Sequence, residues 1–429
     1  MAGDFFTDGQ LWWLGEDNAE GEPYWKWAYR GGTSFTTILN PETNIWRFSV
    51  GGPGSSWPAL PAFREIREIE KNLIEVVLED ETGTLPVGHV VQTRDIIRNQ
   101  VGSFFVKCKN LTLSHMRVMF MHGLGLLTQF CDGVHYEYVN CMPKEGRTIA
   151  STADFFQFSG CRGEVLIEHC RASGAHDDFI NVHGTYLRVI EADYPSKTVL
   201  VRFMHGQSWG FEAFFAGDRI LFTARKTLGP IAENTVASVT RLNDTDIRLV
   251  LTDDLPEMTV GEDAVENITW RPTLTVRNNF FGTSSGHGIL ANAAGTVLIE
   301  DNVFEHNAYG VLRCALDCSL WYESGRPDHI ILRHNHFDHC CSHPSGRIVS
   351  HTQICPPVHD PSFTGWVYPA VTFEENEFIN PPSDTGYHLQ IARVGSVILR
   401  DNIFDKPYTV AQEYVGSLTA INTFTVKDS

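Results

Sequence analysis

The sequence lacks the features by which membrane, metal-binding and nucleic-acid-binding proteins are usually recognised. No run of apolar residues approaches the length of about 18 that a transmembrane helix needs. Histidine and cysteine form neither an HExxH motif nor two cysteine pairs at zinc-site spacing. Basic residues are scarce: 33 Lys and Arg face 52 Asp and Glu, and the net charge of −19 repels phosphate backbones and anionic membranes. We therefore expect no nucleic acid, no membrane, no metal and no other cofactor.

The first residues also lack the basic segment and the long apolar segment of a secretory signal. The protein is expected to be either cytoplasmic or secreted with its signal removed. The ten cysteines fit small apolar side chains of a core better than disulfides, because a chain of 429 residues can bury a large core without cross-links. Extracellular disulfides are the alternative, so the compartment stays open.

A helical period of 3.6 residues is missing as well, and the sequence instead shows short alternating apolar runs that end in glycine or polar residues. Five segments fit one template, apolar-x-apolar-x-x-Asn-x-Phe, with their asparagines at Asn279, Asn302, Asn335, Asn376 and Asn402. These spacings indicate a constant turn of a parallel β-helix with loops of varied length. We predict that each asparagine takes a left-handed bend and joins a side-chain ladder, with the phenylalanines stacked inside. Cys170 holds the asparagine position in a sixth, earlier segment.

Two parts of the chain depart from this repeat. Residues 1–64 are rich in Trp and Gly and are expected to form an irregular N-terminal cap or accessory β region over an open end of the coil. Residues 188–271 alternate like antiparallel strands, which predicts a small inserted β-barrel. The coil would then comprise residues 65–187 and 272–429. For the insertion, a functional loop and a passive lid or dimer surface are equal alternatives.

The chemistry is expected in the stretch just before the insertion. The similar segments 152–158 (TADFFQF) and 176–182 (HDDFINV) are offset by 24 residues, about one turn of such a coil. Parallel strands would therefore stack Asp154 and Asp178 about 4.8 Å apart, with Asp177 beside them. Three crowded carboxylates raise at least one pKa and suit general acid–base hydrolysis of a glycoside with inversion. A calcium site and a plain turn are the alternatives.

The block from residue 86 to residue 187 resembles glycoside hydrolase family 110, the exo-acting α-1,3-galactosidases. The matching phrases are HGLGLL (122–127), TAD (152–154), FSGCRG (158–163) and DDxINVHGTYL (177–187), with WYESG (321–325) further along. This resemblance implies a right-handed parallel β-helix with barrel-like additions and a metal-independent, inverting release of terminal α-1,3-linked galactose. The expected partner is a galactose-terminated oligosaccharide or glycan, and the resemblance also allows a homodimer.

Roles for the acidic residues come from the same resemblance. The family's acidic residues map onto Asp154, Asp177 and Asp178. Its fold is similar to that of the polygalacturonases, inverting enzymes with a comparable Asp…Asp-Asp arrangement. By that analogy Asp177 is the general acid, and Asp154 and Asp178 activate the attacking water.

Three further residues are candidate sugar contacts. His287 falls into the column of the stacked aspartates if Gly288 takes the bend position of the coil. Glu323 and Trp321, in the WYESG phrase, would offer a partner for galactose hydroxyls and an apolar platform for the sugar face. For each of these, an ordinary solvent-facing or packing role is the alternative.

Asn181 and His183 are expected to brace the carboxylates, and Arg313 would serve an anionic or sulfated sugar unless it is an ordinary surface arginine. Two other functions are kept as hypotheses. An endo-acting glycanase or a lyase on another galactan or uronan is the first, and a lyase would need calcium and a base, for which Arg162 is the candidate. A non-catalytic carbohydrate-binding β-helix is the second.

Overall fold

The computed structural model of the protein describes residues 2–7, 11–13, 35–48, 63–71, 73–78, 87–94, 100–341, 350–380 and 387–425. Every regular element in these ranges is a β-strand, from β1 (Ala2–Thr7) to β40 (Phe424–Thr425). The described part of the chain contains no helix that is long and apolar enough to span a membrane. The predicted all-β fold class is confirmed.

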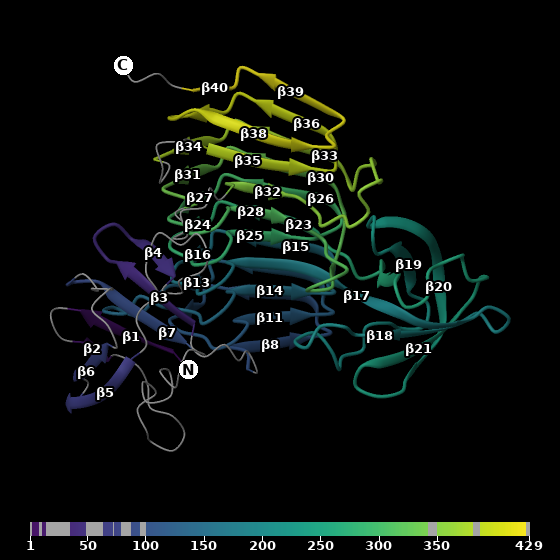
Figure 1. Cartoon of the computed structure of the whole chain (residues 1–429), viewed down its shortest axis with the longest axis horizontal. Coiled ribbons are helices and arrows are strands. Elements are labelled where there is room, and N and C mark those ends of the chain that lie inside the picture. The colour runs from purple at the N-terminus through teal and green to yellow at the C-terminus, as the bar shows by residue number, and fades with distance from the viewer. Residues whose placement is uncertain are drawn as a thin grey trace.

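Three sheets of nine parallel strands form a coil, which stands upright in Figure 1. Sheet I contains β8 (Ser103–Val106), β11 (Leu126–Gln129), β14 (Phe156–Ser159), β17 (Ile180–Asp193), β25 (Ile289–Ala291), β28 (Leu312–Cys314), β32 (Thr352–Ile354), β35 (Tyr387–Ala392) and β38 (Tyr408–Glu413). Sheet II contains β9 (Lys109–Ser114), β12 (Asp132–Glu137), β15 (Arg162–Glu168), β23 (Thr273–Arg277), β26 (Gly295–Glu300), β30 (Pro327–Arg333), β33 (Tyr368–Glu374), β36 (Val394–Arg400) and β39 (Ser417–Ile421). Sheet III contains β10 (Arg117–Val118), β13 (Asn140–Cys141), β16 (Arg171–Ala172), β24 (Phe280–Phe281), β27 (Val303–Glu305), β31 (His336–Asp338), β34 (Glu377–Ile379), β37 (Ile403–Phe404) and β40. Each turn supplies one strand to each sheet, as the repeat predicts for a parallel β-helix.

The asparagine ladder runs along the corner between sheets II and III. Each side-chain amide donates to the carbonyl oxygen of the next asparagine at 2.9–3.0 Å, from Asn279 through to Asn402. The backbone N–H of Cys170 donates to Asn279 Oδ1 at 2.8 Å, so Cys170 holds the expected ladder position. These bonds satisfy polar groups that the coil buries.

One detail of the ladder prediction is wrong: the left-handed bend lies one residue before each asparagine. The positive φ angles, 52–56°, belong to Asn278, Asp301, His334, Glu375 and Asp401. The side chain at the bend points outward, so several residue types are accepted there. The ladder asparagine follows with its amide directed into the coil.

The interior of the coil is apolar. The phenylalanines of the repeat stack in a column as predicted, and Phe155 and Phe179 of the aspartate segments extend it. Neighbouring ring centroids lie 4.5–5.7 Å apart along Phe155, Phe179, Phe281, Phe304, Phe337, Phe378 and Phe404. All ten cysteines are free and eight of them are buried, which fits their expected role as small apolar side chains. The coil is therefore a rigid, packed scaffold, and chemistry has to sit on its outer face.

The predicted inserted barrel is confirmed. Strand β17 runs out of sheet I and pairs with β22 (Ala264–Asn267), followed in order by β19 (Arg219–Ala224), β20 (Gly229–Arg241), β21 (Asp246–Leu251) and β18 (Thr198–Arg202). A further pairing of β18 with β17 closes the ring. The barrel projects to the right of the coil in Figure 1 and has an apolar core of its own, which includes Leu187, Phe222 and Leu249.

The described N-terminal strands fit the accessory β region, the second of the two expected alternatives, and not an irregular cap. The described strands β1, β2 (Leu11–Trp13), β3 (Phe35–Asn40), β4 (Ile45–Phe48), β5 (Phe63–Glu70), β6 (Leu73–Leu78) and β7 (Val90–Arg94) form one antiparallel sheet. The expected start of the coil at residue 65 would include strands β5 to β7, but the first parallel turn begins at β8. Alternating apolar residues indicate a strand without indicating its partner, which explains the difference.

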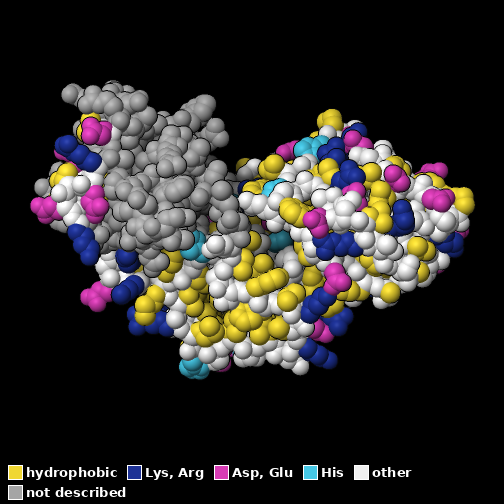
Figure 2. All heavy atoms as spheres, turned by 90° about the horizontal axis from the view of Figure 1, so that it is seen from below, with side chains coloured by type: hydrophobic (Ala, Val, Ile, Leu, Met, Phe, Trp, Pro, Cys, Tyr) yellow, Lys and Arg dark blue, Asp and Glu magenta, His cyan; other side chains and the backbone are white. Residues whose placement is uncertain are grey.

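The first turn of the coil is an open end. Among the described residues, β8, β9 and β10 each pair on one side only. Figure 2, which views this end, shows apolar side chains gathered beside the barrel, and Phe104, Val106, Met119 and Phe120 are between 38% and 51% exposed. Such edges are the part of a parallel coil that needs covering.

Candidate active site

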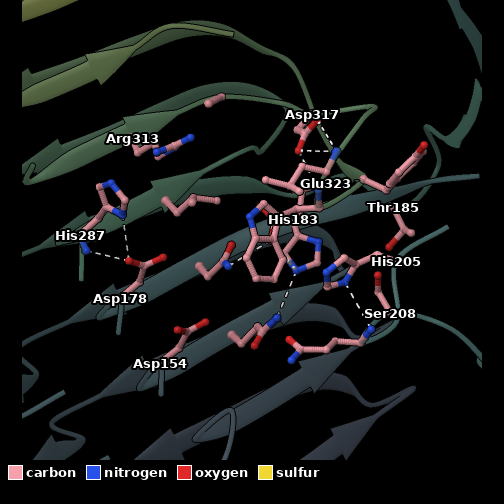
Figure 3. A pocket seen from close by; sticks show the side chains of 18 of the residues that line it. Asp154, Asp178, His183, Thr185, His205, Ser208, His287, Arg313, Asp317 and Glu323 are labelled. Carbon is pink, nitrogen blue, oxygen red and sulfur yellow. Dashed lines mark hydrogen bonds and ion pairs between the residues drawn. The ribbon is translucent and has the colours of Figure 1, made fainter. Parts of the chain in front are cut away.

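A pocket of about 510 Å³ lies on the outer face of sheet I, where β17 leaves the coil for the barrel. Its walls come from four places. These are the turns before β14 and β17, residues 203–218 between β18 and β19 (here called the barrel loop), residues 315–322 between β28 and β29 (Glu323–Ser324), here called the rim loop, and residues 355–359 after β32. Figure 3 shows Asp154 and Asp178 at one end of the pocket and His205 and Ser208 of the barrel loop at the other. Its volume is in the range typical of small-ligand sites.

Three aspartates, here called the acidic cluster, converge at one end. Phe156 pairs with Ile180 in register, which brings Asp154 and Asp178 to equivalent positions of adjacent turns. The cluster is completed by Asp177, and one oxygen from each of the three carboxylates lies within 4.8 Å of the others. Asp154 and Asp178 are 2% and 6% exposed, so the charges are held in a largely desolvated place. The predicted juxtaposition of the three carboxylates is observed.

The backbone explains why these side chains face outward. The N–H of Phe155 donates to the carbonyl oxygen of Asp178 at 3.1 Å, which continues the parallel pairing beyond the strand ends. The rings of Phe155 and Phe179 stack inside the coil at 5.7 Å. Because consecutive side chains of an extended segment point to opposite faces, the preceding aspartates project into the pocket.

His287 holds Asp178 from the next turn, in the column that the sequence predicted. Its backbone N–H and its Nδ1 approach Asp178 Oδ1 at 2.7 and 3.0 Å, so Nδ1 carries the proton and donates. Burial raises the pKa of Asp178, but His287 and Arg313 more than offset it, and the pKa lies below its ordinary value. Asp178 is therefore an ionised carboxylate, which is the state a general base needs.

The next strand segment places Asn181 and His183 on the pocket floor. Asn181 Nδ2 donates to Glu323 Oε1 at 3.4 Å, and His183 Nδ1 lies 2.7 Å from the carbonyl oxygen of Gly184. His183 Nδ1 is thus the protonated nitrogen, and Nε2 accepts from Gln157 Nε2 at 3.2 Å. These two residues were expected to brace the carboxylates, and the bonds described here connect them to Glu323 and Gln157.

Four buried polar atoms of pocket-lining residues have no hydrogen-bonding partner among the described residues: Gln157 Oε1, Asn181 Oδ1, Ser208 Oγ and His287 Nε2. Buried polar atoms are nearly always paired in folded proteins. Amide oxygens, a hydroxyl and a ring nitrogen are the partners that the hydroxyl groups of a carbohydrate, which both donate and accept, can use. Gln157 aligns with Asn181 in the two similar segments, yet sequence reasoning did not propose it as a site residue.

The remaining predicted residues also line the pocket. Glu323, on β29, pairs with Thr185 of β17, and Trp321 lies on the rim loop, 44% exposed. Arg313, on β28, is the single arginine or lysine among the described lining residues, and its charge acts on Asp178. His205 and Asp317 line the pocket too, but neither belongs to the repeat or to a matching phrase, so the sequence did not point to them.

The chain thus combines a parallel β-helix, an inserted barrel and an acidic pocket at their junction. Residues 198–265 match the family model of the GLAA-B beta-barrel domain II. The chain is 34% identical over 365 residues to the α-1,3-galactosidase A of Bacteroides fragilis, covering 80% of this chain and 58% of that protein. It is 33% identical over 372 residues to that of Akkermansia muciniphila, covering 84% of this chain and 60% of the relative. The α-1,3-galactosidase B of Phocaeicola vulgatus is 29% identical over 68% of this chain and 52% of its own length.

The chain is similar to these α-1,3-galactosidases, and the resemblance to glycoside hydrolase family 110 noted in the sequence is confirmed. It spans about three fifths of the length of the galactosidase A relatives it matches.

Proposed function

We propose that this chain is an exo-acting glycoside hydrolase that releases terminal α-1,3-linked galactose from galactose-terminated glycans. The observation that carries the proposal is the acidic cluster, in which one oxygen of each carboxylate lies within 4.8 Å of the others. It lies at the end of a pocket whose lining residues carry buried polar atoms without a partner among the described residues. The names of the relatives supply the linkage and the sugar.

In the proposed mechanism, Asp177 donates a proton to the glycosidic oxygen while Asp154 and Asp178 orient and deprotonate a water. Asp177 is the more exposed of the adjacent pair, so it can reach a substrate oxygen. A water between two carboxylate oxygens up to 4.8 Å apart lies within hydrogen-bond distance of both. The lowered pKa of Asp178 supports its part as base. Attack from that water on the face opposite the leaving group gives inversion.

Retention is a second candidate, and the carboxylate spacing favours it. Inverting enzymes with two carboxyl groups usually hold them about 6.5–9.5 Å apart, and retaining enzymes about 5–5.5 Å apart. The acidic cluster is closer to the second range. Inversion stays the first proposal, because with three carboxylates one adjacent pair can hold the water while the third acts as acid.

The lyase hypothesis loses its proposed base. Arg162 Nη2 lies 2.8 Å from Asp132 Oδ2, and its guanidinium lies 4.4 Å from the ring centre of Trp270. Arg162 is absent from the described lining of the pocket. A lyase would have to use Arg313, whose charge acts on Asp178.

The test is incubation with α-1,3-galactobiose, the linear α-galactosyl trisaccharide and the branched blood group B trisaccharide, followed by NMR. Initial release of β-galactose supports inversion, and initial α-galactose supports retention. Asp154→Asn and Asp178→Asn should abolish release while circular dichroism and thermal unfolding stay close to wild type. An absence of galactose from all three substrates would overturn the proposal, and an unsaturated product would instead indicate a lyase. The homodimer that the resemblance allows is checked by sedimentation on the same sample.

A further inference from the structure

The antiparallel sheet of β1 to β7, here called the N-terminal sheet, contacts the coil at the residue that precedes Asp177. This sheet lies to the left of the coil in Figure 1. Nε2 of His176 lies 3.1 Å from Oε1 of Gln92 on β7, and its ring meets the ring of Trp46 on β4 edge to face at 5.2 Å. None of these three side chains is more than 1% exposed, so the contact is a packed interface.

One face of the N-terminal sheet forms this interface. Thr37 on β3 is the direct partner of Gln92, and Leu39 is the partner of both Val90 on β7 and Trp46. Because residues two apart on a strand share a face, these five side chains lie on one face of the sheet. All five are buried, and Leu39, Trp46 and Val90 form an apolar cluster. The sheet thus presents an apolar patch and one amide to the coil.

The amide of Gln92 is fixed by three hydrogen bonds. Its Oε1 accepts from the hydroxyl of Thr37 at 2.9 Å, and its Nε2 donates to Thr148 Oγ1 at 2.5 Å. A carbonyl oxygen can only accept, so Nε2 of His176 carries a proton and donates to the same Oε1. Thr148 lies in the segment between β13 and β14 that also carries Asp154. Gln92 therefore joins the N-terminal sheet to two successive turns of the coil, and both turns carry members of the acidic cluster.

The coil holds the backbone at Asp177 from the two neighbouring turns. In the turn before, the carbonyl oxygen of Ser151 accepts the backbone N–H of His176 at 3.1 Å. In the turn after, Gly286 takes the position equivalent to Asp177, and a β-carbon there would lie 2.3 Å from the carbonyl carbon of Asp177. Only glycine lets the two turns come this close. The bond from Gln92 to His176 adds a third support, from outside the coil.

We propose that Gln92 is a positioning residue of the reaction: through His176 it holds the turn that carries Asp177, so that the carboxyl group of Asp177 reaches the glycosidic oxygen. The N-terminal sheet is then a working part of the active site. The inference rests on the proposed function, in which Asp177 is the acid.

The step that depends on this support is the proton transfer. The proton passes from Asp177 to the glycosidic oxygen as the bond between C1 and that oxygen breaks, while the attacking water adds its oxygen to C1 and gives a proton to the base. A general acid has to lie about 2.6–3.2 Å from the oxygen that it protonates. A displacement of about 1 Å can lower the rate about 100-fold.

The test compares two substrates that differ in their need for an acid. α-1,3-Galactobiose releases a sugar alkoxide unless a proton is supplied, whereas α-galactosyl fluoride releases fluoride, which needs little protonation. Gln92→Leu should lower kcat at least about tenfold for galactobiose and less than about twofold for the fluoride, with both KM values within about twofold of wild type. Gln92→Glu, whose carboxylate oxygen can accept from Nε2 of His176, should restore most of the galactobiose rate. If Gln92→Leu does not fold, Gln92→Asn withdraws the amide by one methylene and should give the same difference between the substrates.

Val91→Ala is the matched control, with unfolding in urea measured for every variant. Val91 is the neighbour of Gln92 on β7, is 1% exposed and points to the opposite face of the N-terminal sheet. Its truncation weakens the packing of the sheet but keeps the bond to His176, so any loss of activity should be equal on both substrates. Equal losses in Gln92→Leu, or none, with a wild type that cuts both substrates would overturn this inference and leave the proposed function standing. A wild type that releases galactose from neither substrate would overturn both.

Discussion

The contact between His287 and Asp178 gives the sharpest prediction, because one substitution removes half of it. In His287→Leu the backbone N–H, at 2.7 Å from Asp178 Oδ1, is kept, whereas the Nδ1–H at 3.0 Å is lost. A hydrogen bond to a charged group contributes about 1.5–3 kcal/mol. Its loss should therefore shift the equilibrium between ionised and protonated Asp178 about 10- to 100-fold toward the protonated form. Burial, which raises the pKa, is then opposed by fewer groups.

The lowered pKa of Asp178 sets the direction in which stability and activity change with pH. In the wild type the ionised carboxylate stabilises the fold above its ordinary pKa of 3.8, and this contribution is lost as the pH falls through the lower folded-state value. Activity that needs the carboxylate should fall in the same acidic range. In His287→Leu the acidic limb of the kcat/KM profile should move to higher pH, whereas the basic limb should stay in place.

The assay is galactose release across the pH range, with unfolding by urea measured in parallel. His329→Leu is the matched control, since its Nε2 is paired with Thr372 Oγ1 at 2.9 Å and His329 is absent from the described pocket lining. His287→Gln, whose amide can donate in place of Nδ1, should restore part of the wild-type profile. An acidic limb in His287→Leu that coincides with the wild type would refute the part assigned to His287.

Three other predictions concern the scaffold and the alternatives. Asn335→Ala deprives the buried N–H and amide of Asn302 of their acceptor, at 3.1 and 3.0 Å, and should lower the free energy of unfolding by about 2–4 kcal/mol in urea titrations. Gln92→Leu removes the acceptor that lies 3.1 Å from Nε2 of the buried His176, which precedes Asp177 in the chain. This substitution should lower the free energy of unfolding by about 1–3 kcal/mol in the same titrations. EDTA should leave galactose release unchanged; a loss that calcium restores would favour the cation site that three carboxylates also suit.

The parts of the site that repeat were predictable from the sequence. The 24-residue offset put Asp154 over Asp178, and extending the template by one turn put His287 beside them, because register in a parallel coil is set by the apolar positions. The exact bend position was missed by one residue, since an outward-facing left-handed residue tolerates many side chains and leaves no compositional mark.

What the sequence did not predict lies where the repeat is absent. His205 and Asp317 come from the barrel loop and the rim loop, which reach the pocket only because β17 carries the barrel to that edge of the coil. Strands β5 to β7 alternate in the same way as strands of the coil, so the pattern alone places them there wrongly. Only tertiary pairing distinguishes the two arrangements.

The insertion of the barrel also bears on the order in which the chain folds. Equivalent residues in adjacent turns of sheet II are 21–41 residues apart everywhere except between β15 and β23, where Val165 and Leu274 are 109 apart. Closing that longer loop costs about 1 kcal/mol more in chain entropy. The barrel has its own core and pairs Leu187 with Val265, so once folded it removes most of that length. We expect the barrel to fold before the two halves of the coil join, and the pocket at their junction to be the last part to form and the first to open.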